Sequence, residues 1–106
     1  MGQMLISCGE KMEGIEVVAQ VDQGDDLGAI IGDCDVVIDF SLHGATSSCA
    51  AICAKNGKAL VIGTTGHTDV EKASVLAHQK TIAVVWASHY STGVNTLFWL
   101  TRKAAE

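Results

Sequence analysis

The 106 residues contain no proline and few basic side chains. Average usage of about 5% would supply roughly five prolines, so no loop of this chain is stiffened by a pyrrolidine ring. Seven Lys and Arg stand against twelve Asp and Glu, which gives a net charge of −5. A protein that binds nucleic acid needs a basic stripe along the phosphate backbone. The composition therefore excludes that class of function.

Long apolar runs and export signals are missing as well. The longest apolar runs are residues 59–62 and 82–87, far below the roughly 20 residues of a transmembrane helix. Residues 1–12 lack the basic-then-apolar order of a secretory signal, because Lys11 follows the apolar residues. We therefore expect a cytoplasmic protein without a membrane anchor.

Paired C-x-x-C spacing is absent from the four cysteines, Cys8, Cys34, Cys49 and Cys53. Without an export signal, they are expected to be reduced thiols in apolar positions. Cys49 and Cys53 are four apart and could share a helix face, but no third or fourth ligand stands nearby. Two small buried side chains, and no metal site, are the expectation.

Hydrophobic periodicity alternates between helix and strand along the chain. It predicts helices over residues 2–12 and 43–56, another beginning at Thr68, and a last one from Val94 onward. It predicts strands over residues 15–21, 35–40, 59–64 and 82–87. This alternation, with near-continuous apolar strands, indicates an α/β fold with a parallel sheet and flanking helices.

Local signals support several of these elements. Gly57 lies where a helix end favours a left-handed residue, and Thr68 with Glu71 has the spacing of a capping box. The helix after Thr68 is expected to bury the stripe Val70, Ala73, Leu76 and Ala77. The strands over residues 35–40 and 82–87 are expected to be buried on both faces.

Ligands of an open parallel sheet bind beyond the carboxyl ends of its strands. Asp22 follows the first predicted strand, where an acid can bind ribose hydroxyls, or where it is simply a solvated turn residue. The Gly63-Thr64-Thr65-Gly66 run permits close backbone approach to a ligand, or is a plain strand-to-helix turn. Ser41 is expected to be a helix N-cap and could also contact a ligand. Of the four histidines, only His89 lies beside this edge.

Three motifs, in order, carry a family resemblance: VVIDFS at residues 36–41, VIGTTG at 61–66 and STGVN at 91–95. At these spacings the chain resembles the N-terminal domain of dihydrodipicolinate reductase (4-hydroxy-tetrahydrodipicolinate reductase) over nearly all its length. The resemblance implies a Rossmann-like domain that binds NADH or NADPH. It also implies an oxidoreductase of the diaminopimelate route of lysine biosynthesis, which reduces a cyclic dicarboxylate.

The resemblance also assigns cofactor contacts. Asp22 would meet the adenosine ribose, and Met1 would belong to the end of the family's glycine loop. The cofactor cleft would be lined near the nicotinamide by Phe40, Ser41, Gly63, Thr64 and Thr65, and closed by Ala87, Ser88, His89 and Tyr90. His89-Tyr90 stands where the family usually has Asn-Phe. Gln23 stands where the family commonly has an Arg or Lys for a 2′-phosphate, so we expect NADH to be preferred, with NADPH possible.

The resemblance finally implies parts that these residues do not include. The family's first strand and most of its glycine loop would precede Met1, which would leave the neighbouring strand edges unpaired. Its substrate domain, with the catalytic histidine and lysine and the tetramer-forming sheet, would follow Glu106. We expect residues 1–106 to be a partial dinucleotide-binding domain, inactive alone, whose last helix has uncovered apolar residues. A non-catalytic α/β interaction module, or a remnant of the reductase fold, is the alternative.

Overall fold

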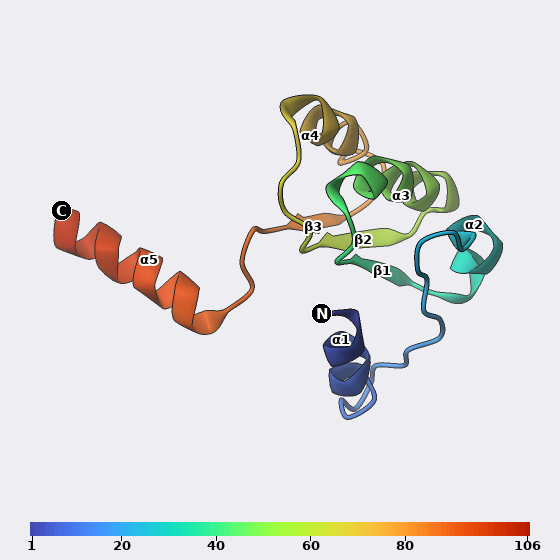
Figure 1. The fold of residues 1–106 in the computed structure, drawn as a ribbon, viewed down its shortest axis with the longest axis horizontal. Helices are drawn as coiled ribbons and strands as arrows, with labels where there is room; N and C mark the ends of the chain where they lie inside the picture. Colours follow the sequence, from blue (N-terminus) through green and yellow to red (C-terminus); the bar gives the residue numbers. More distant parts are fainter.

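A three-stranded parallel sheet forms the centre of the computed structural model, which describes all of residues 1–106 (Figure 1). Its strands are β1 (Val36–Asp39), β2 (Ala59–Ile62) and β3 (Val84–Trp86), in the order β1-β2-β3. In the register, Val37 pairs with Leu60 and Leu60 pairs with Val84. The predicted α/β class with a parallel sheet is confirmed.

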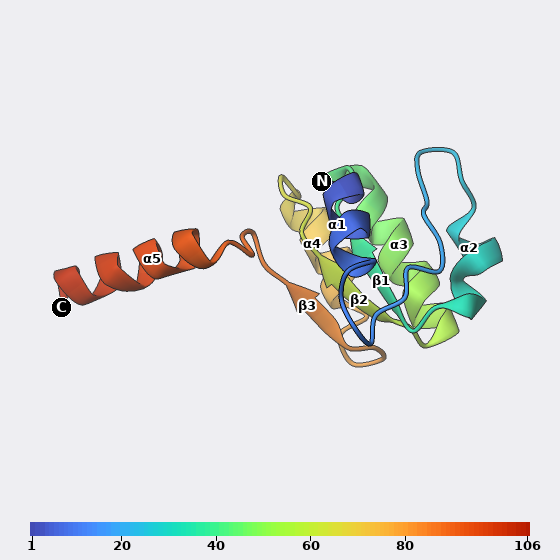
Figure 2. The same ribbon diagram turned by 90° about the horizontal axis from the view of Figure 1, so that it is seen from below.

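Five α-helices and one 3₁₀ helix precede, connect or follow the strands in the sequence. Helices α3 (His43–Asn56) and α4 (Asp69–Leu76) make the crossovers and lie together on one side of the sheet (Figures 1 and 2). The remaining helices are α1 (Gly2–Gly9), α2 (Leu27–Ile30), the 3₁₀ helix η1 (Ile31–Asp33) and α5 (Thr92–Ala105). The core lies between sheet and crossover helices and consists of Ile31, Ala50, Cys53, Leu60, Ile62, Val75 and Ile82.

The crossover helices begin and end as their sequences predict. Helix α3 spans residues 43–56, and Gly57 ends it with φ +66°, a left-handed conformation that glycine adopts without a Cβ penalty. At the start of α4, the Thr68 hydroxyl accepts from Glu71 N at 3.2 Å, and Thr68 N donates to Glu71 Oε2 at 2.7 Å. The capping box is therefore confirmed.

The predicted apolar stripe of α4 is wrong. Val70 is 80% exposed and Leu76 is also exposed, whereas Val75 is fully buried. The Glu71 carboxylate accepts a hydrogen bond from, or forms an ion pair with, His43 on α3 at 2.9 Å. Residues i and i+4 share a helix face, so Glu71 and Val75 both face α3. Helix α4 therefore turns the face with Val75 toward the core, and the predicted stripe faces solvent.

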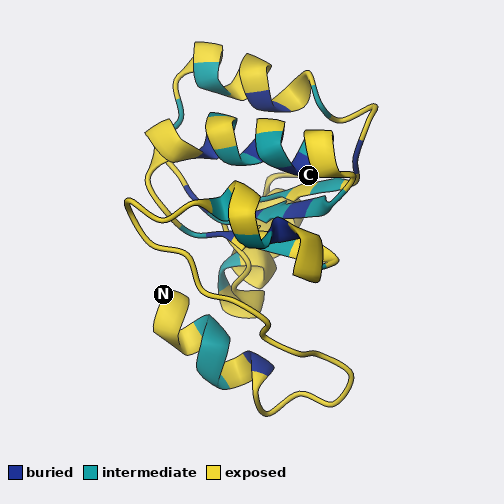
Figure 3. Ribbon diagram, turned by 90° about the vertical axis from the view of Figure 1, so that its right-hand side faces the viewer, coloured by how far each residue is buried: buried dark blue, intermediate teal, exposed yellow.

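The prediction that the strands are buried on both faces is also wrong. Val36, Ile38 and Val85 are 47%, 54% and 55% exposed, and exposed stretches alternate with buried ones along the sheet in Figure 3. Side chains alternate between the two faces of a strand, and α3 and α4 cover only one of them. Helix α1 lies on the other side but leaves these three side chains exposed.

The predicted strand over residues 15–21 does not form. The segment has no strand pairing and exposes its apolar side chains, Ile15, Val17, Val18 and Val21. A strand is stable only beside a hydrogen-bonding partner, and no strand of these residues lies next to it. Because no strand lies beside β1 on the side away from β2, β1 has one unpaired edge, as expected.

The predicted helix over residues 2–12 ends at Gly9. Lys11 N and Met12 N donate to the main-chain oxygens three residues earlier, at 3.1 and 3.2 Å, and so turn the chain. Gly9 is buried against the returning segment, where a Cβ would lie 2.8 Å from Val17 Cγ2. This close approach of two segments is a tertiary contact that helical periodicity does not reveal.

Helix α5 extends away from the rest of the molecule (Figures 1 and 2). It begins at Thr92, because the Ser91 hydroxyl caps Val94 N at 3.3 Å. None of its residues is buried, and four large apolar side chains are more than half exposed, namely Leu97, Phe98, Trp99 and Leu100. The expectation of uncovered apolar residues is confirmed. No helix of the structure has both the length and the apolar character to cross a membrane.

Candidate functional site

The loops that follow β1 and β2 are joined by a buried polar cluster. Ser41 N donates to Asp39 Oδ1 and to Thr64 Oγ1, each at 2.9 Å. The Ser41 hydroxyl makes a short hydrogen bond to Asp39 Oδ1, and Thr64 Oγ1 lies 3.2 Å from both the carboxylate and the main-chain oxygen of Asp39. Asp39 and Thr64 are each 5% exposed. The parallel register thus brings the predicted Ser41 and Thr64 together.

Ser41 is not the predicted N-cap of α3. Leu42 occupies that position, and no side chain caps the helix. The Ser41 hydroxyl is engaged by Asp39 instead, because a carboxylate two residues away is a stronger acceptor than a neutral group. Ser41 itself remains exposed to solvent.

Aromatic rings pack beside this cluster. A Cβ on Gly63 would lie 2.7 Å from Cδ1 of Phe40 and closer still to two other ring carbons, so the ring occupies the space that a side chain would need. Phe40 and Tyr90 have ring centroids 6.1 Å apart, and the Tyr90 hydroxyl donates to Ile62 O at 2.7 Å. The loop after β3 is thereby attached to the end of β2.

A groove of about 510 Å³ opens between the ends of β2 and β3 and helix α4. We call it the β2–β3 groove. Its walls include four predicted residues, Thr64, Thr65, Ala87 and Ser88, and five others, Gly66, His67, Lys72, Leu76 and Trp86. Its volume lies within the range of small-molecule sites. The Thr65 and Ser88 side chains make no hydrogen bond within the chain and are free to bind a ligand.

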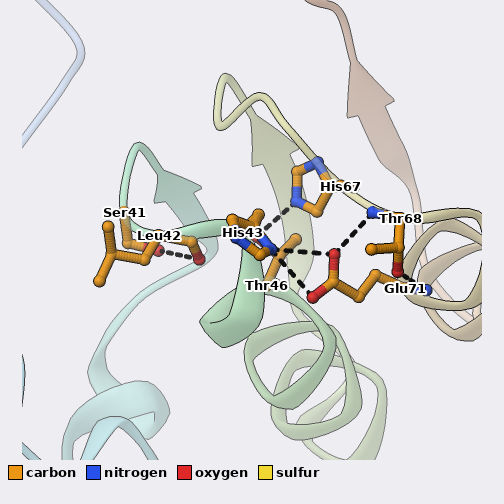
Figure 4. Close-up of polar contacts among 7 residues, drawn as sticks. All are labelled: Ser41, Leu42, His43, Thr46, His67, Thr68 and Glu71. Atoms are coloured by element: carbon orange, nitrogen blue, oxygen red, sulfur yellow. Dashed lines mark hydrogen bonds and ion pairs between the residues drawn. The ribbon is translucent and has the colours of Figure 1, made fainter.

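Two histidines connect α3 to α4 and to the loop that precedes it, as Figure 4 shows. His67 Nε2 lies 2.9 Å from Thr46 Oγ1, and its ring packs edge-on against Trp86 with centroids 4.9 Å apart. His43 Nδ1 lies 2.9 and 3.0 Å from the two Glu71 carboxylate oxygens. The hydrogen bond from Thr68 N, and then that from His43, hold the pKa of Glu71 below its usual value. These contacts fix one wall of the groove.

Helix α3 also carries the cysteine pair behind Asp39. All four cysteines are free, but Cys8 is exposed, so its predicted apolar position is wrong. A hydrogen bond with Cys53, burial, and the negative charge of Asp39 raise the pKa of Cys49. Cys49 therefore stays a neutral thiol. Cys53 is buried in the core as predicted, whereas Cys49 packs against the core and is only partly buried.

Three predicted site residues lie apart from the cluster and the groove. Met1 is exposed at the start of α1. Asp22 is in an exposed turn, in which its Oδ1 accepts from Gln23 N at 2.7 Å and its main-chain N donates to Asp25 Oδ2 at 2.8 Å. His89 packs against Phe98 of α5, with ring centroids 5.8 Å apart. No hydrogen bond joins any of the three to Ser41 or Thr64.

Sequence reasoning missed Asp39, His67, Lys72 and Trp86. Asp39 had a visible signal, since an acid at the end of an apolar strand, two residues before a serine, is placed where it must be hydrogen-bonded. The other three had none, because they share a groove only once α4 and the end of β3 are positioned in the fold.

The donor and acceptor set fits the dinucleotide that the resemblance implies. Exposed hydroxyls of Ser41, Thr65 and Ser88 can bind a carboxamide and ribose hydroxyls. The rings of Phe40 and Tyr90 offer apolar faces to a planar ring. The hydroxyls and rings at this edge are thus suited to bind and orient a ligand.

Comparison with known proteins identifies relatives over most of the chain. Residues 1–90 match the family described as "Dihydrodipicolinate reductase, N-terminus". A protein of Akkermansia muciniphila named 4-hydroxy-tetrahydrodipicolinate reductase is 53% identical over 85 residues, which are 80% of this chain and 35% of the relative. A protein of the same name from Halorhodospira halophila is 36% identical over an alignment of 128 positions, gaps included, which covers 99% of this chain and 48% of the relative. The chain spans about a third to a half of the length of these relatives.

Proposed function

We propose, from the premise that this chain belongs to the dihydrodipicolinate reductase family through its N-terminal domain, that it holds a nicotinamide dinucleotide for the reduction of 4-hydroxy-tetrahydrodipicolinate. The observation that carries this proposal is the meeting of three strand ends at one edge. There Ser41 bonds to Thr64, and Tyr90 bonds to the end of β2. Strand ends of a parallel sheet are where dinucleotides bind.

The residues of this edge bind and orient the cofactor, which supplies the hydride. Ser41 and Thr65 bind polar groups of the nicotinamide end, and Phe40 and Tyr90 shield the ring from water. Ala87 and Ser88 close the β2–β3 groove from the β3 side. We propose that Met1, at the start of α1, and His89, in the loop after β3, also contact the cofactor.

Cofactor preference is proposed to favour NADH over NADPH. Asp22 lies in a turn with Asp25 and Asp26, and the three carboxylates stand beside an uncharged Gln23. One oxygen of Asp22 accepts from Gln23 N, which leaves the other to accept from a ribose hydroxyl. A 2′-phosphate would be repelled by this charge and would find no cation at Gln23.

Turnover is proposed to require more than these residues. Residues 1–106 supply part of a dinucleotide-binding domain, and the longer relatives carry the remaining 52% to 65% of their length outside the match. We propose that the cyclic dicarboxylate substrate, its catalytic groups and the contacts of a homo-tetramer belong to that remainder. The site of action is proposed to be the cytoplasm.

Titration of the chain with NADH and NADPH, followed by calorimetry, tests the proposal. We expect NADH to bind, and the double variant Thr65→Val/Ser88→Ala to weaken it by about tenfold, since two hydrogen bonds of about 0.5 to 1.5 kcal/mol each are lost. The matched control Thr81→Val alters an exposed threonine outside the groove and should change nothing. We expect no NADH oxidation when substrate is added.

The exposed apolar residues of the sheet and of α5 favour one competing function, a non-catalytic interaction module. This module would bind no dinucleotide. Failure of NADH to bind at millimolar concentration would therefore reject the proposed function and support the module.

A further inference from the structure

The Asp39 carboxylate concentrates its contacts on one oxygen. Its Oδ1 faces the main-chain N of Ser41, the hydroxyl of Ser41 and the hydroxyl of Thr64, while its buried Oδ2 has no hydrogen-bond partner. Burial of a carboxylate is costly unless donors surround it. This cluster is therefore a fixed arrangement that holds the ends of β1 and β2 together before any ligand arrives.

The hydrogens of the cluster can be assigned by counting. A carboxylate accepts only, and a serine hydroxyl has one hydrogen and two acceptor lone pairs. The Ser41 hydroxyl has two candidate acceptors, the charged Asp39 Oδ1 and, at 3.5 Å, the neutral Leu42 O (the latter drawn in Figure 4), and the charge-assisted bond to Asp39 is the stronger. The single hydrogen thus points inward to Asp39, and the exposed oxygen of Ser41 can only accept.

The hydrogen of Thr64 is assigned in the same way. Its hydroxyl donates to Asp39, through either the carboxylate or the main-chain oxygen at 3.2 Å, and it accepts from Ser41 N at 2.9 Å. Thr64 is therefore fully engaged inside the protein. Ser41 is the one member of the cluster that presents a free acceptor to solvent.

We propose that Asp39 is a positioning residue, which keeps the Ser41 hydroxyl oriented as a hydrogen-bond acceptor for an N–H group of the ligand. The proposal rests on the function proposed above. At the nicotinamide end of the cofactor, the carboxamide amine is the N–H donor. Asp39 does not touch the cofactor, since its side chain is buried behind Ser41. It acts on specificity through Ser41.

The first test needs no ligand. Hydrogen exchange of the Ser41 amide is measured by NMR in the whole chain and in Asp39→Asn, which keeps the size of the side chain but removes its charge. Because charge-assisted hydrogen bonds are about twice as strong as neutral ones, we expect exchange to accelerate by about tenfold or more. The matched control Asp35→Asn makes the same change on an exposed carboxylate just before β1 and should leave Ser41 unchanged. Equal exchange in the wild type and Asp39→Asn overturns the positioning role.

The second test measures ligand preference. NADH is compared with the reduced 3-acetylpyridine analogue, in which a methyl group replaces the carboxamide amine. We expect the wild type to prefer NADH by about tenfold, as one unsatisfied hydrogen bond costs about 1 to 3 kcal/mol, and Ser41→Ala and Asp39→Asn to lose most of this preference. Ser41→Ala keeps Asp39, so it remains informative if Asp39→Asn does not fold. Full preference in Ser41→Ala contradicts the proposal.

The two tests separate this inference from the proposed function. If the wild type binds neither dinucleotide, the proposed function is refuted and the ligand part of the inference with it. The exchange rates of the Ser41 amide still test whether Asp39 positions Ser41. If NADH binds but Ser41→Ala keeps the preference, only the inference is refuted.

Discussion

Replacement of Gly63 by alanine tests how tightly the strand ends are packed. The backbone of Gly63 does not have a positive φ, so an alanine is not strained there, and the whole cost is steric. The new Cβ would collide with the ring of Phe40, which itself packs toward Tyr90 at a centroid distance of 6.1 Å. Overpacking of this kind costs about 1 to 3 kcal/mol. We expect Gly63→Ala to lower the free energy of unfolding by that amount.

Urea denaturation followed by far-UV circular dichroism measures this cost, and a double-mutant cycle gives its cause. In a Phe40→Ala background the ring is absent, so adding Gly63→Ala should cost no more than about 0.5 kcal/mol, the usual limit for a substitution without a structural conflict. An equal cost in the two backgrounds would show that Phe40 is not the obstacle. No cost in the wild-type background would refute the packing of the two loops.

The remaining predictions concern the capping box and the cofactor. Thr68→Ala should lower the free energy of unfolding by about 1 kcal/mol in a urea titration, and the exposed Ser74→Ala on the same helix should not. Because the pKa of Glu71 is depressed in the folded state, the carboxylate adds to the free energy of unfolding above pH 4.5, and this addition is lost as the pH falls through the lower folded value. Glu71→Gln should therefore make the free energy of unfolding less sensitive to acid. An unchanged dependence of stability on pH would contradict this. Gln23→Arg should improve NADPH binding by about tenfold, since a charge-assisted bond is worth about 1.5 to 3 kcal/mol. Gln79→Arg, which adds the same charge elsewhere, should not, and an equal gain in both variants would point to bulk charge.

Elements whose partners are close in sequence could be predicted well. Helix α3, its end at Gly57 and the capping box of α4 depend on local backbone geometry and on side chains three residues apart, and all appear as expected. The register that brings Ser41 to Thr64 follows from two adjacent parallel strands. These features needed only periodicity, capping rules and the usual topology of parallel sheets.

Features that depend on distant contacts could not be predicted. Residues 15–21 have strand composition, but composition does not supply a neighbouring strand. The rotation of α4 depends on the pairing of His43 with Glu71, 28 residues apart, and that pairing was invisible to periodicity. Asp39 could be predicted in part. Its burial follows from its place at the end of an apolar strand, whereas its three donors, Ser41 N and the hydroxyls of Ser41 and Thr64, depend on the fold.

Amide hydrogen exchange with and without NADH tests the central claim most directly, that the ends of β1 and β2 form a dinucleotide site. The account predicts that NADH slows exchange at Ser41 and at Gly63, Thr64 and Thr65, and more weakly at Asp22, while α5 does not change. Exchange that is unaltered by NADH, or protection confined to α5 and the exposed sheet face, would contradict it.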